Sequence, residues 1–376
     1  MSKNRNRLSP VEENSNGAAV NHPSIGLNPS RFIELLDEAA AAPRIAALRK
    51  KATAIKQTIN AGDHRDELFN ANGNGVSLRR DILTAELEQV LAARTIERAR
   101  YYLQRLARGV ADERTTAVND INLRRWKEYD EVITDSLWVE PKRDTAGAHL
   151  GSYWGNFIPQ IPRQLMLRYT KKHDWVLDCF LGSGTTLIEC RRLGRNGIGV
   201  ELNMEVARQA KQRIRQESNP HHVHAEVITG DARRLNLRRA LERQGVEQVQ
   251  LVILHPPYHD IIAFSDNARD LSTAQTTEDF LRMFGEVIDN ATPRLERRRY
   301  LAVVIGDKYE RGEWLPLGFA CMQEVLKRDY RLKSIVVKNF DETRAKRDQK
   351  QLWRYRALAG GFYVFKHEYV LLFQKK

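Results

Sequence analysis

The segment His255-Pro256-Pro257-Tyr258 follows an apolar run and combines an imidazole, two prolines and an aromatic ring. Proline fixes the backbone and has no N–H group, so the carbonyl oxygens of such a turn stay available as hydrogen-bond acceptors. An exocyclic amine on a nucleobase is a poor nucleophile because its lone pair is delocalised into the ring. Two acceptors that hold both of its N–H bonds favour a pyramidal amine able to attack, and Tyr258 offers a flat face for stacking. A rigid turn without chemistry is the alternative for these four residues taken alone.

A glycine turn lies upstream, in the sequence LDCFLGSGTT at 177–186. Gly182 and Gly184 allow close approach of the backbone to a ligand, and a helix expected over about 185–194 presents N–H groups at its start. A phosphate-binding Walker loop is excluded because Thr185 stands where that motif needs Lys, and a dinucleotide GxGxxG motif is excluded because position 187 is Leu. The turn therefore predicts a cofactor site of another kind.

Two carboxylates strengthen this interpretation. Glu201 ends the next apolar run, where it can accept both hydroxyl groups of a ribose. Asp231 ends the run after that and is placed to receive an adenine amino group. Three consecutive strand ends thus point to one nucleoside.

The elements that must position these residues are short, continuous apolar runs separated by helix-compatible stretches. They lie at 175–180, 197–202, 224–231, 249–255 and 300–307. Such runs suit strands covered on both faces, so we expect an α/β fold with a parallel, doubly wound sheet. Two more runs, 331–340 and 367–376, enclose a basic segment without an obvious helix, which favours an antiparallel last pair.

The N-terminal part has a different pattern. Residues 1–30 are rich in Asn, Ser, Pro and Gly and predict a disordered tail. The apolar stripe Ile45, Leu48, Ala52, Ile55 and Ile59 predicts a helix that stops near Gly62, and a second helical segment is expected over about 78–108, after a loop at 70–75. Residues 31–125 are therefore expected to form a helical hairpin or bundle, and 126–376 the catalytic domain. A packed scaffold, a partner-binding module and a nucleic-acid-reading module are the alternatives for the helices.

Charge points to a polyanion. The chain of 376 residues carries 61 Lys and Arg against 48 Asp and Glu, a formal net charge of +13. Residues 151–376 hold 38 basic and 27 acidic side chains, whereas residues 1–150 are nearly balanced at 23 and 21. Lys and Arg gain affinity by neutralising phosphates, so the excess favours a nucleic-acid partner.

Other features exclude alternatives. No apolar stretch is long enough to span a bilayer and the first residues lack a signal peptide's apolar region, so a cytoplasmic protein without membrane contact is expected. Cys179, Cys190 and Cys321 are odd in number and lack CxxC spacing, which argues against disulfides and a zinc site. The histidines at 221, 222 and 224 have no organised Cys or carboxylate partner, so no metal is expected.

Taken together, the motifs resemble the DNA amino-methyltransferase family, which uses S-adenosylmethionine to methylate adenine N6 or cytosine N4. The family's FxGSGTT-type turn is matched by Phe180, Gly182, Ser183, Gly184, Thr185 and Thr186, and its [D/N/S]PPY-type motif by residues 255–258. The segment at 153–170 resembles the motif that helps enclose the methionine end of the cofactor. The resemblance covers about 135–376 and implies a Rossmann-like class I methyltransferase sheet, mostly parallel with the last strand antiparallel, behind an N-terminal helical domain.

The resemblance also implies the roles of individual residues. Catalytic positions are His255, Pro256, Pro257 and Tyr258, and cofactor-binding positions are Asn156, Phe157, Pro159, Asp178, Phe180, Gly182, Gly184, Thr185, Glu201 and Asp231. The first catalytic position departs from the family, since it is His rather than Asp, Asn or Ser. A neutral imidazole can accept one hydrogen bond and the Pro256 carbonyl a second, so activity is expected to fall on the acid side of a pKa near about 6.5.

The expected function is site-specific methylation of double-stranded DNA at a flipped base, with cytosine N4 slightly favoured over adenine N6 because the motif lacks Asp. A restriction-modification system or a mobile element, in a bacterium or phage, is the expected setting. The alternatives are an RNA base methyltransferase of the guanine N2 type, a silent nucleic-acid-binding protein in which His255 marks a decayed site, and a protein-methylating enzyme.

A basic segment at 344–356 is expected to form a loop that contacts phosphates and offers stacking surface. The candidate nucleic-acid-binding residues are Lys308, Arg344, Lys346, Arg347, Lys350, Trp353, Arg354 and Tyr355. A solvated basic loop is the alternative. The N-terminal helices could also bind a protein partner or a second copy of the chain.

Overall fold

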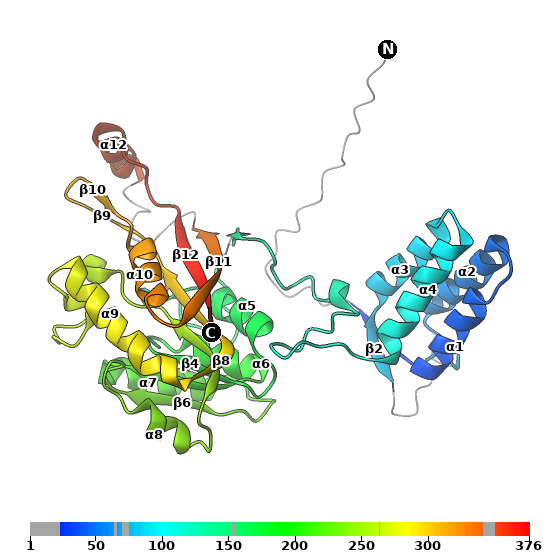
Figure 1. Ribbon diagram of the computed structural model, residues 1–376, viewed down its shortest axis with the longest axis horizontal. Coiled ribbons are helices and arrows are strands. Elements are labelled where there is room, and N and C mark those ends of the chain that lie inside the picture. Colours follow the sequence, from blue (N-terminus) through cyan, green and yellow to red (C-terminus); the bar gives the residue numbers. More distant parts are fainter. Residues whose placement is uncertain are drawn as a thin grey trace, which may run out of the picture. The chain divides into compact units, whose positions relative to one another are not determined.

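The computed structural model describes residues 23–63, 66–69, 75–140, 142–151, 153, 155–262, 264–340 and 350–376 (Figure 1). Contacts divide the chain into two compact units, a helical unit of 19–134 with 164–172 and a sheet unit of 135–163 with 173–376. The boundary predicted at 125/126 therefore lies at 134/135. Helix α5 (Gln160–Tyr169) is split between the units, because its second half makes contacts with the helical unit's chain.

The sheet unit is built around eight strands in the order β3-β11-β12-β8-β7-β4-β5-β6. Their bounds are β3 (Leu137–Trp138), β4 (Trp175–Asp178), β5 (Asn196–Glu201), β6 (Ala225–Thr229), β7 (Val249–Leu254), β8 (Leu295–Ile305), β11 (Tyr330–Asn339) and β12 (His367–Lys375). Strand β12 pairs antiparallel with β8 and β11, and the other pairs are parallel. The predicted α/β class, the predicted strands and the antiparallel last strand are confirmed.

Helices cover both faces of this sheet, because its central strands are apolar on both sides. Helices α8 (Leu237–Glu242), α9 (Thr277–Ala291) and α10 (Leu317–Leu326) share one buried cluster with alternate residues of the strands, including Phe280, Phe284 and Phe373. Helix α6 (Thr185–Leu193) packs on the other face at Gly197, where an added Cβ would lie 2.4 Å from a methyl carbon of Leu187. Helix α7 (Met204–Gln216) follows β5.

The chain order creates a crevice in the sheet. From β4 the strands proceed outward through β5 to β6, and then return to β7 on the other side of β4. The turns that follow β4 and β7 therefore lie next to each other at the carboxyl ends of adjacent strands, where sheets of this type bind ligands. The glycine turn and the HPPY turn occupy these two places.

The last third of the sheet unit carries a projecting part (Figure 1). Strands β9 (Lys308–Glu310) and β10 (Glu313–Leu315) form a hairpin after β8, and α12 (Lys350–Gly360) precedes β12. The loop predicted for 344–356 is therefore wrong over 350–356, where Lys, Gln, Leu and Arg favour a helix. Arg344, Lys346 and Arg347 lie outside the described residues.

Besides the second half of α5 and a short 3-10 helix, the described residues of the helical unit form four helices and a two-stranded sheet. They are α1 (Pro29–Ala40), α2 (Ile45–Ala61), α3 (Arg80–Ala92) and α4 (Ile96–Ala111), with β1 (Ser24–Leu27) antiparallel to β2 (Val76–Arg79). The predicted helix ending near Gly62 is confirmed, since Gly62 caps α2 in the left-handed conformation. The segment predicted as one helix over 78–108 is two, because Thr95 accepts the Arg98 N–H and starts α4 anew. The predicted tail is wrong over 24–30, which form β1 and the start of α1, and residues 1–22 and 70–74 lie outside the described residues.

Short 3-10 helices complete the described chain at η1 (Trp126–Glu128), η2 (His259–Ile261), η3 (Leu271–Thr273) and η4 (Thr292–Arg294). Within the described residues, no helix combines the length and the apolar character that crossing a membrane requires.

Candidate functional site

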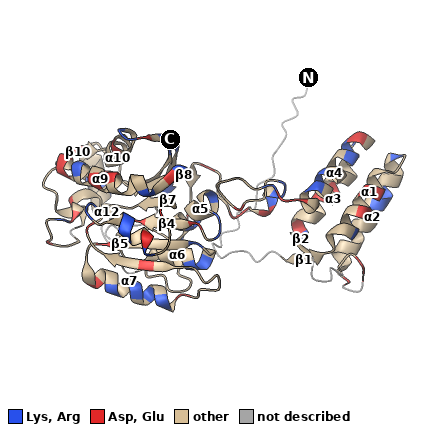
Figure 2. Ribbon diagram, turned by 60° about the horizontal axis from the view of Figure 1, so that its bottom comes forward, with Lys and Arg blue, Asp and Glu red and all other residues tan. Residues whose placement is uncertain are grey.

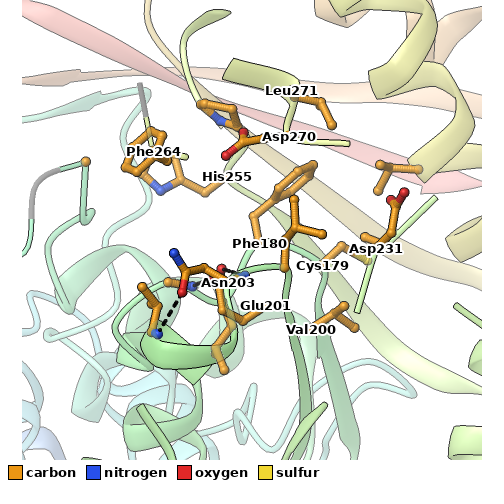
Figure 3. Close-up of a pocket in the computed structure, with 18 of the residues that line it drawn as sticks. Cys179, Phe180, Val200, Glu201, Asn203, Asp231, His255, Phe264, Asp270 and Leu271 are labelled. Carbon is orange, nitrogen blue, oxygen red and sulfur yellow. Dashed lines mark hydrogen bonds between the residues drawn. The ribbon is translucent and has the colours of Figure 1, made fainter. Parts of the chain in front are cut away.

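A pocket of about 870 Å³, measured to its open mouth, lies at the carboxyl ends of β4, β5, β6 and β7 (Figure 3). Each strand end contributes a residue predicted from the sequence: Phe180 and Gly182 after β4, Glu201 at the end of β5, Asp231 after β6, and His255 and Pro257 after β7. Residues far apart in the sequence are thus brought to one site.

The glycine turn is shaped by left-handed backbone at Gly182 (φ +54°) and Gly184 (φ +95°), which glycine adopts without strain. The Asp178 side chain holds this turn by two hydrogen bonds. Its carboxylate accepts the Phe180 N–H at 2.9 Å and the Thr186 hydroxyl at 2.5 Å. Complete burial raises the pKa of Asp178 to about 6, whereas the hydrogen bonds from these two donors oppose the rise because they stabilise the ionised form. Asp178 and Gly184 therefore shape the turn and do not line the pocket.

Glu201 faces the pocket from the end of β5. Its two oxygens accept the N–H groups of Gly182 at 2.9 Å and Asn203 at 2.8 Å, which fixes the carboxylate in one orientation. Burial raises the pKa of Glu201 and outweighs these hydrogen bonds. A carboxylate oxygen has a second lone pair, so both oxygens can still accept from the two hydroxyl groups of a ribose.

Asp231 lines the pocket as predicted, but it is also paired with Arg233, whose guanidinium lies 2.8 Å from Oδ2. Burial alone would raise the pKa of Asp231, yet the hydrogen bonds from Arg233 lower it. The carboxylate is therefore charged and fixed in place, ready to accept from an amino group.

The segment before α5 closes another side of the pocket. Asn156 and Phe157 line it, whereas Pro159 and Thr185 do not. The Thr185 hydroxyl donates to Asn156 Oδ1 at 2.8 Å and so ties this segment to the glycine turn. Arg143, which no motif singled out, donates to the carbonyls of Asn156 (3.3 Å) and Phe157 (2.9 Å) and fixes both residues.

A second loop, at 264–271, was not predicted as part of the site. Figure 3 shows Phe264 and Asp270 near His255, on the side of the pocket opposite Glu201. Asp270 is held by the Ser265 hydroxyl at 2.8 Å. Within the described lining, the carboxylates of Glu201, Asp231 and Asp270 outnumber one guanidinium, that of Arg269. The site therefore suits a ligand that carries positive charge.

His255 lies at the pocket between two aromatic rings. Its ring centroid is 4.7 Å from that of Phe157 and 5.8 Å from that of Tyr258. Burial of the ring removes it from water and lowers the pKa of His255 to about 4. The negative charge of Glu368 acts in the opposite direction, but its effect is smaller. Within the described part of the chain, neither ring nitrogen of His255 has a hydrogen-bond partner. The imidazole is thus neutral at physiological pH and able to accept a hydrogen bond.

Tyr258 is held by its hydroxyl group, a contact that the sequence did not reveal. The hydroxyl donates to Glu368 Oε2 at 2.8 Å, and Glu368 Oε1 lies 3.2 Å from Lys338 Nζ. Both members of this ion pair are buried. The Tyr258 ring packs on Gly306, where an added Cβ would lie 2.8 Å from the ring. Of the four residues of the HPPY turn, His255 and Pro257 line the pocket, and Pro256 and Tyr258 do not.

The prediction that Lys308 contacts nucleic acid is corrected by its surroundings. Lys308 is only 6% exposed, and its ammonium group pairs with Glu310 at 2.7 Å and with Asp260. It also lies 3.2 Å from His259 Nδ1. Lys308 therefore holds the segment that follows the HPPY turn instead of offering a charge to solvent.

Helix α12 carries the remaining described candidates for nucleic-acid contact. Arg354 and Tyr355 are exposed, Tyr355 by 69%, and Trp353 is half-buried beneath the Arg356 guanidinium. Lys350 is the first residue of the helix. After the helix, Phe362 stacks on Tyr309 of the β9–β10 hairpin with ring centroids 4.0 Å apart. The helix is thus anchored through the chain that follows it.

Three potential metal-ligating side chains also meet in the sheet unit. Ligand atoms of Asp144, His149 and Glu189 lie within 4.8 Å of one another. The Arg192 guanidinium lies 3.2 Å from Asp144 and 3.0 Å from Glu189, so a cation already balances these carboxylates.

The order of the strands, with β12 alone antiparallel in the eight-stranded sheet, and the pocket at the switch point are those of a Rossmann-like methyltransferase sheet. The fixed Glu201 carboxylate, the Asp231 carboxylate and the acidic lining fit the ribose, the adenine amino group and the positive charge of S-adenosylmethionine. The lining of the pocket therefore fits the cofactor that the sequence predicted.

Comparison with known proteins gives partial matches. Residues 80–212 match a family described as DNA methylase, and residues 165–289 match one described as conserved hypothetical protein 95. The Type II methyltransferase M.MjaII of Methanocaldococcus jannaschii is 34% identical over 85 residues, which are 20% of this chain and 16% of that protein. M.SmaI of Serratia marcescens is 42% identical over 94 residues, 24% of this chain and 32% of that protein. M1.MboII of Moraxella bovis is 49% identical over 53 residues, 13% and 20% of the two chains.

These matched segments are short, and the chain spans between 16% and 32% of the length of these three relatives. Within them, the resemblance to the DNA amino-methyltransferase family that the motifs predicted is confirmed.

Proposed function

We propose that this chain transfers a methyl group from S-adenosylmethionine to the exocyclic amino group of a base in double-stranded DNA. The observation that carries the proposal is the position of the HPPY turn, because His255 and Pro257 border the same pocket as Glu201 and the glycine turn. A base that enters beside His255 would meet the methionine end of a cofactor whose ribose lies at Glu201.

The residues around the turn would hold the amino group. When bound, S-adenosylmethionine supplies an electrophilic methyl group on a positively charged sulfur. The neutral imidazole of His255 accepts one N–H bond of the amino group, and the Pro256 carbonyl accepts the other. Both acceptors draw the lone pair of the amine away from the ring, and the imidazole can take the proton that the nitrogen releases. Positioning and electrostatics are thus the main contributions of the protein.

The Tyr258 ring would provide the back wall of the base site. Its hydroxyl donates a hydrogen bond to Glu368. This bond fixes the orientation of the ring. The base must leave the duplex to reach this place, at a cost of a few kcal/mol. We favour cytosine N4 over adenine N6 because the first position of the motif is not Asp, which the family associates with adenine.

Helix α12 would contribute contacts to the DNA backbone. Arg354 can neutralise a phosphate and the exposed Tyr355 can pack on a sugar or an unpaired base. The names of the relatives, Type II methyltransferases, support a role as the modification enzyme of a restriction-modification system in the cytoplasm of a bacterial cell.

The substitution Tyr258→Ala tests this proposal. It removes the wall of the base site but leaves Glu201 and the glycine turn intact. We expect single-turnover methyl transfer to DNA to fall by at least about 100-fold, the range of a misplaced reactant, while the dissociation constant for S-adenosylmethionine changes by less than about threefold. An equal loss of both quantities would show that Tyr258 supports the fold only, and would count against the proposal.

A further inference from the structure

We propose that the helical unit binds the phosphate backbone of duplex DNA through one face of α4 together with the segment 122–128. We call this surface the α4 face and define it by Arg98, Tyr101, Arg105, Arg108 and Trp126. The choice of DNA as the polyanion rests on the proposed function, whereas the surface itself is identified from its own geometry and charge.

The largest excess of positive charge in this unit lies in one part of the chain. Residues 19–93 carry nine Lys and Arg against nine Asp and Glu, whereas residues 94–128 carry nine against five. Figure 2 shows basic positions recurring along α4. Because the rest of the unit is balanced, the excess is a local feature and not a general adjustment of solubility.

The basic side chains of α4 follow one another along a single face. Arg98, Tyr102, Arg105 and Arg108 recur at steps of four and three, so they lie in a row. The Arg98 guanidinium lies 4.8 Å from the Tyr102 ring centroid, and that of Arg105 lies 5.2 Å from it. Among the described residues, Arg98 and Arg108 have no carboxylate partner. Their charges are therefore available to an external anion.

A cavity continues this row towards the segment 122–128. It measures about 820 Å³ to its open mouth and is lined by Arg105, Arg108 and Trp126, among others. Trp126 is 64% exposed, which is unusual for the largest apolar side chain. Lys127 Nζ lies 5.9 Å from its ring centroid. Aromatic faces between basic groups are typical of surfaces that contact nucleic acids.

The segment that carries Trp126 is held firmly. The buried Asn122 side chain accepts the N–H groups of Arg114 at 3.2 Å and Arg124 at 3.0 Å. The Arg125 guanidinium donates to the Ser77 carbonyl at 2.6 Å and so fastens the segment to β2. The exposure of Trp126 is therefore imposed by a fixed backbone, which is what a contact surface needs.

One buried carboxylate fixes two of the cations. Glu86, at 9% exposure, pairs with Arg105 and with Lys127, and so joins α4 to the segment 122–128. These two cations share one negative charge, so the pair retains a net positive charge at the mouth of the cavity. Glu86 thereby orders the centre of the α4 face, while Arg98 and Arg108 flank it.

The dimensions and chemistry fit DNA better than a protein partner. Ten residues separate Arg98 from Arg108, about 15 Å along a helix, over which a DNA strand presents several phosphates. A protein interface of similar extent would need a larger apolar centre than the exposed Tyr101, Leu123 and Trp126 provide.

The test compares three variants of the full chain for binding to a 30-base-pair duplex across a range of KCl concentrations. In Arg98→Ala/Arg108→Ala we expect about tenfold or more weaker binding at 0.1 M salt, and a slope of log affinity against log salt that is shallower by about 1.8. In Trp126→Ala we expect at least about fivefold weaker binding with an unchanged slope, because no charge is lost.

The matched control is Arg44→Ala/Lys50→Ala, which removes two exposed charges from the same unit outside the α4 face. It should bind DNA like wild type. All variants replace exposed side chains, so their melting temperatures should equal that of wild type.

The outcomes separate this inference from the proposed function. Wild type that binds and methylates DNA while the α4-face variants match the control would overturn the inference alone. Wild type that binds no DNA and methylates none would overturn the proposed function as well. The α4-face variants could instead bind DNA normally but form a smaller assembly than wild type in analytical ultracentrifugation. This result would show that the surface is a protein interface, and would also overturn the inference.

Discussion

At the residue scale, the surroundings of His255 change its pKa in a way that the HPPY motif alone does not predict. An HPPY sequence with an ordinary histidine predicts loss of activity near pH 6.5. Crowding by Phe157 and Tyr258 lowers the pKa of His255 to about 4. The histidine can therefore act as a permanent acceptor at physiological pH, as Asn or Ser would at this position.

The pH profile of methyl transfer tests this environment. Because the depressed pKa keeps the imidazole neutral, we expect the single-turnover rate to stay level from pH 8 to about 5.5 and to fall only as His255 becomes protonated, near pH 4 to 5. His255→Asn should remove the acid limb, since an amide oxygen accepts at every pH. A wild-type midpoint near 6.5 would contradict the burial of the ring.

The Tyr258 hydroxyl makes a second prediction at this scale. Tyr258→Phe keeps the ring but loses the hydrogen bond to Glu368, which holds the ring in place. A lost hydrogen bond of about 1.4 kcal/mol corresponds to a tenfold slower transfer, with little change in cofactor affinity. Tyr330→Phe is the control, because its hydroxyl bonds Thr292 at the opposite end of the strands. An equal effect of both substitutions on the rate would show a loss of general stability and no positioning role.

At the element scale, the site depends on the strand ends that hold its carboxylates. Glu201 is the last residue of β5, and two backbone N–H groups fix its orientation. The sequence predicted Glu201 because the carboxyl ends of parallel strands share one edge of the sheet.

Glu201→Gln tests this element. The new amide NH₂ would face N–H donors where the carboxylate accepted, so one hydrogen bond is replaced by a donor–donor contact. We expect the dissociation constant for S-adenosylmethionine, measured by calorimetry, to rise by about tenfold or more. Glu205→Gln, an exposed change on α7, should leave it unaltered. Unchanged affinity in Glu201→Gln would remove Glu201 from the cofactor site.

Helix α12 supports a prediction of its own. Arg354→Ala should weaken DNA binding and reduce the salt slope by about 0.9, the value for one phosphate contact. Tyr355→Ala should weaken binding without changing the slope. Measurement across salt concentrations, beside the Arg44→Ala/Lys50→Ala control, distinguishes these effects. Two variants that bind like the control would exclude α12 from the interface.

At the scale of the whole molecule, the sequence predicted the sheet well because its strands are continuous apolar runs that end in motif residues. It predicted His255, Glu201 and Asp231 at one pocket for the same reason. It could not predict the loop at 264–271 or Arg143, since these residues act through tertiary contacts that leave no local pattern.

Burial explains the other differences. Lys308 has the composition of a surface cation, yet Asp260 and Glu310 neutralise it inside the fold. The contact of Tyr258 with Glu368 spans 110 positions in the sequence. In the helical unit, the segment predicted as one helix over 78–108 gave no sign of the break at 93–95, because apolar residues at helical spacing resume after Thr95.

The central claim is that the HPPY turn directs a methyl group to an exocyclic amino group in DNA. The most direct measurement incubates the chain with labelled S-adenosylmethionine and separate pools of DNA and RNA, and then identifies the methylated nucleosides by mass. The account predicts N4-methylcytosine, or N6-methyladenine, in DNA and no label in RNA. Label in RNA alone, or in neither pool while the cofactor still binds, would contradict it.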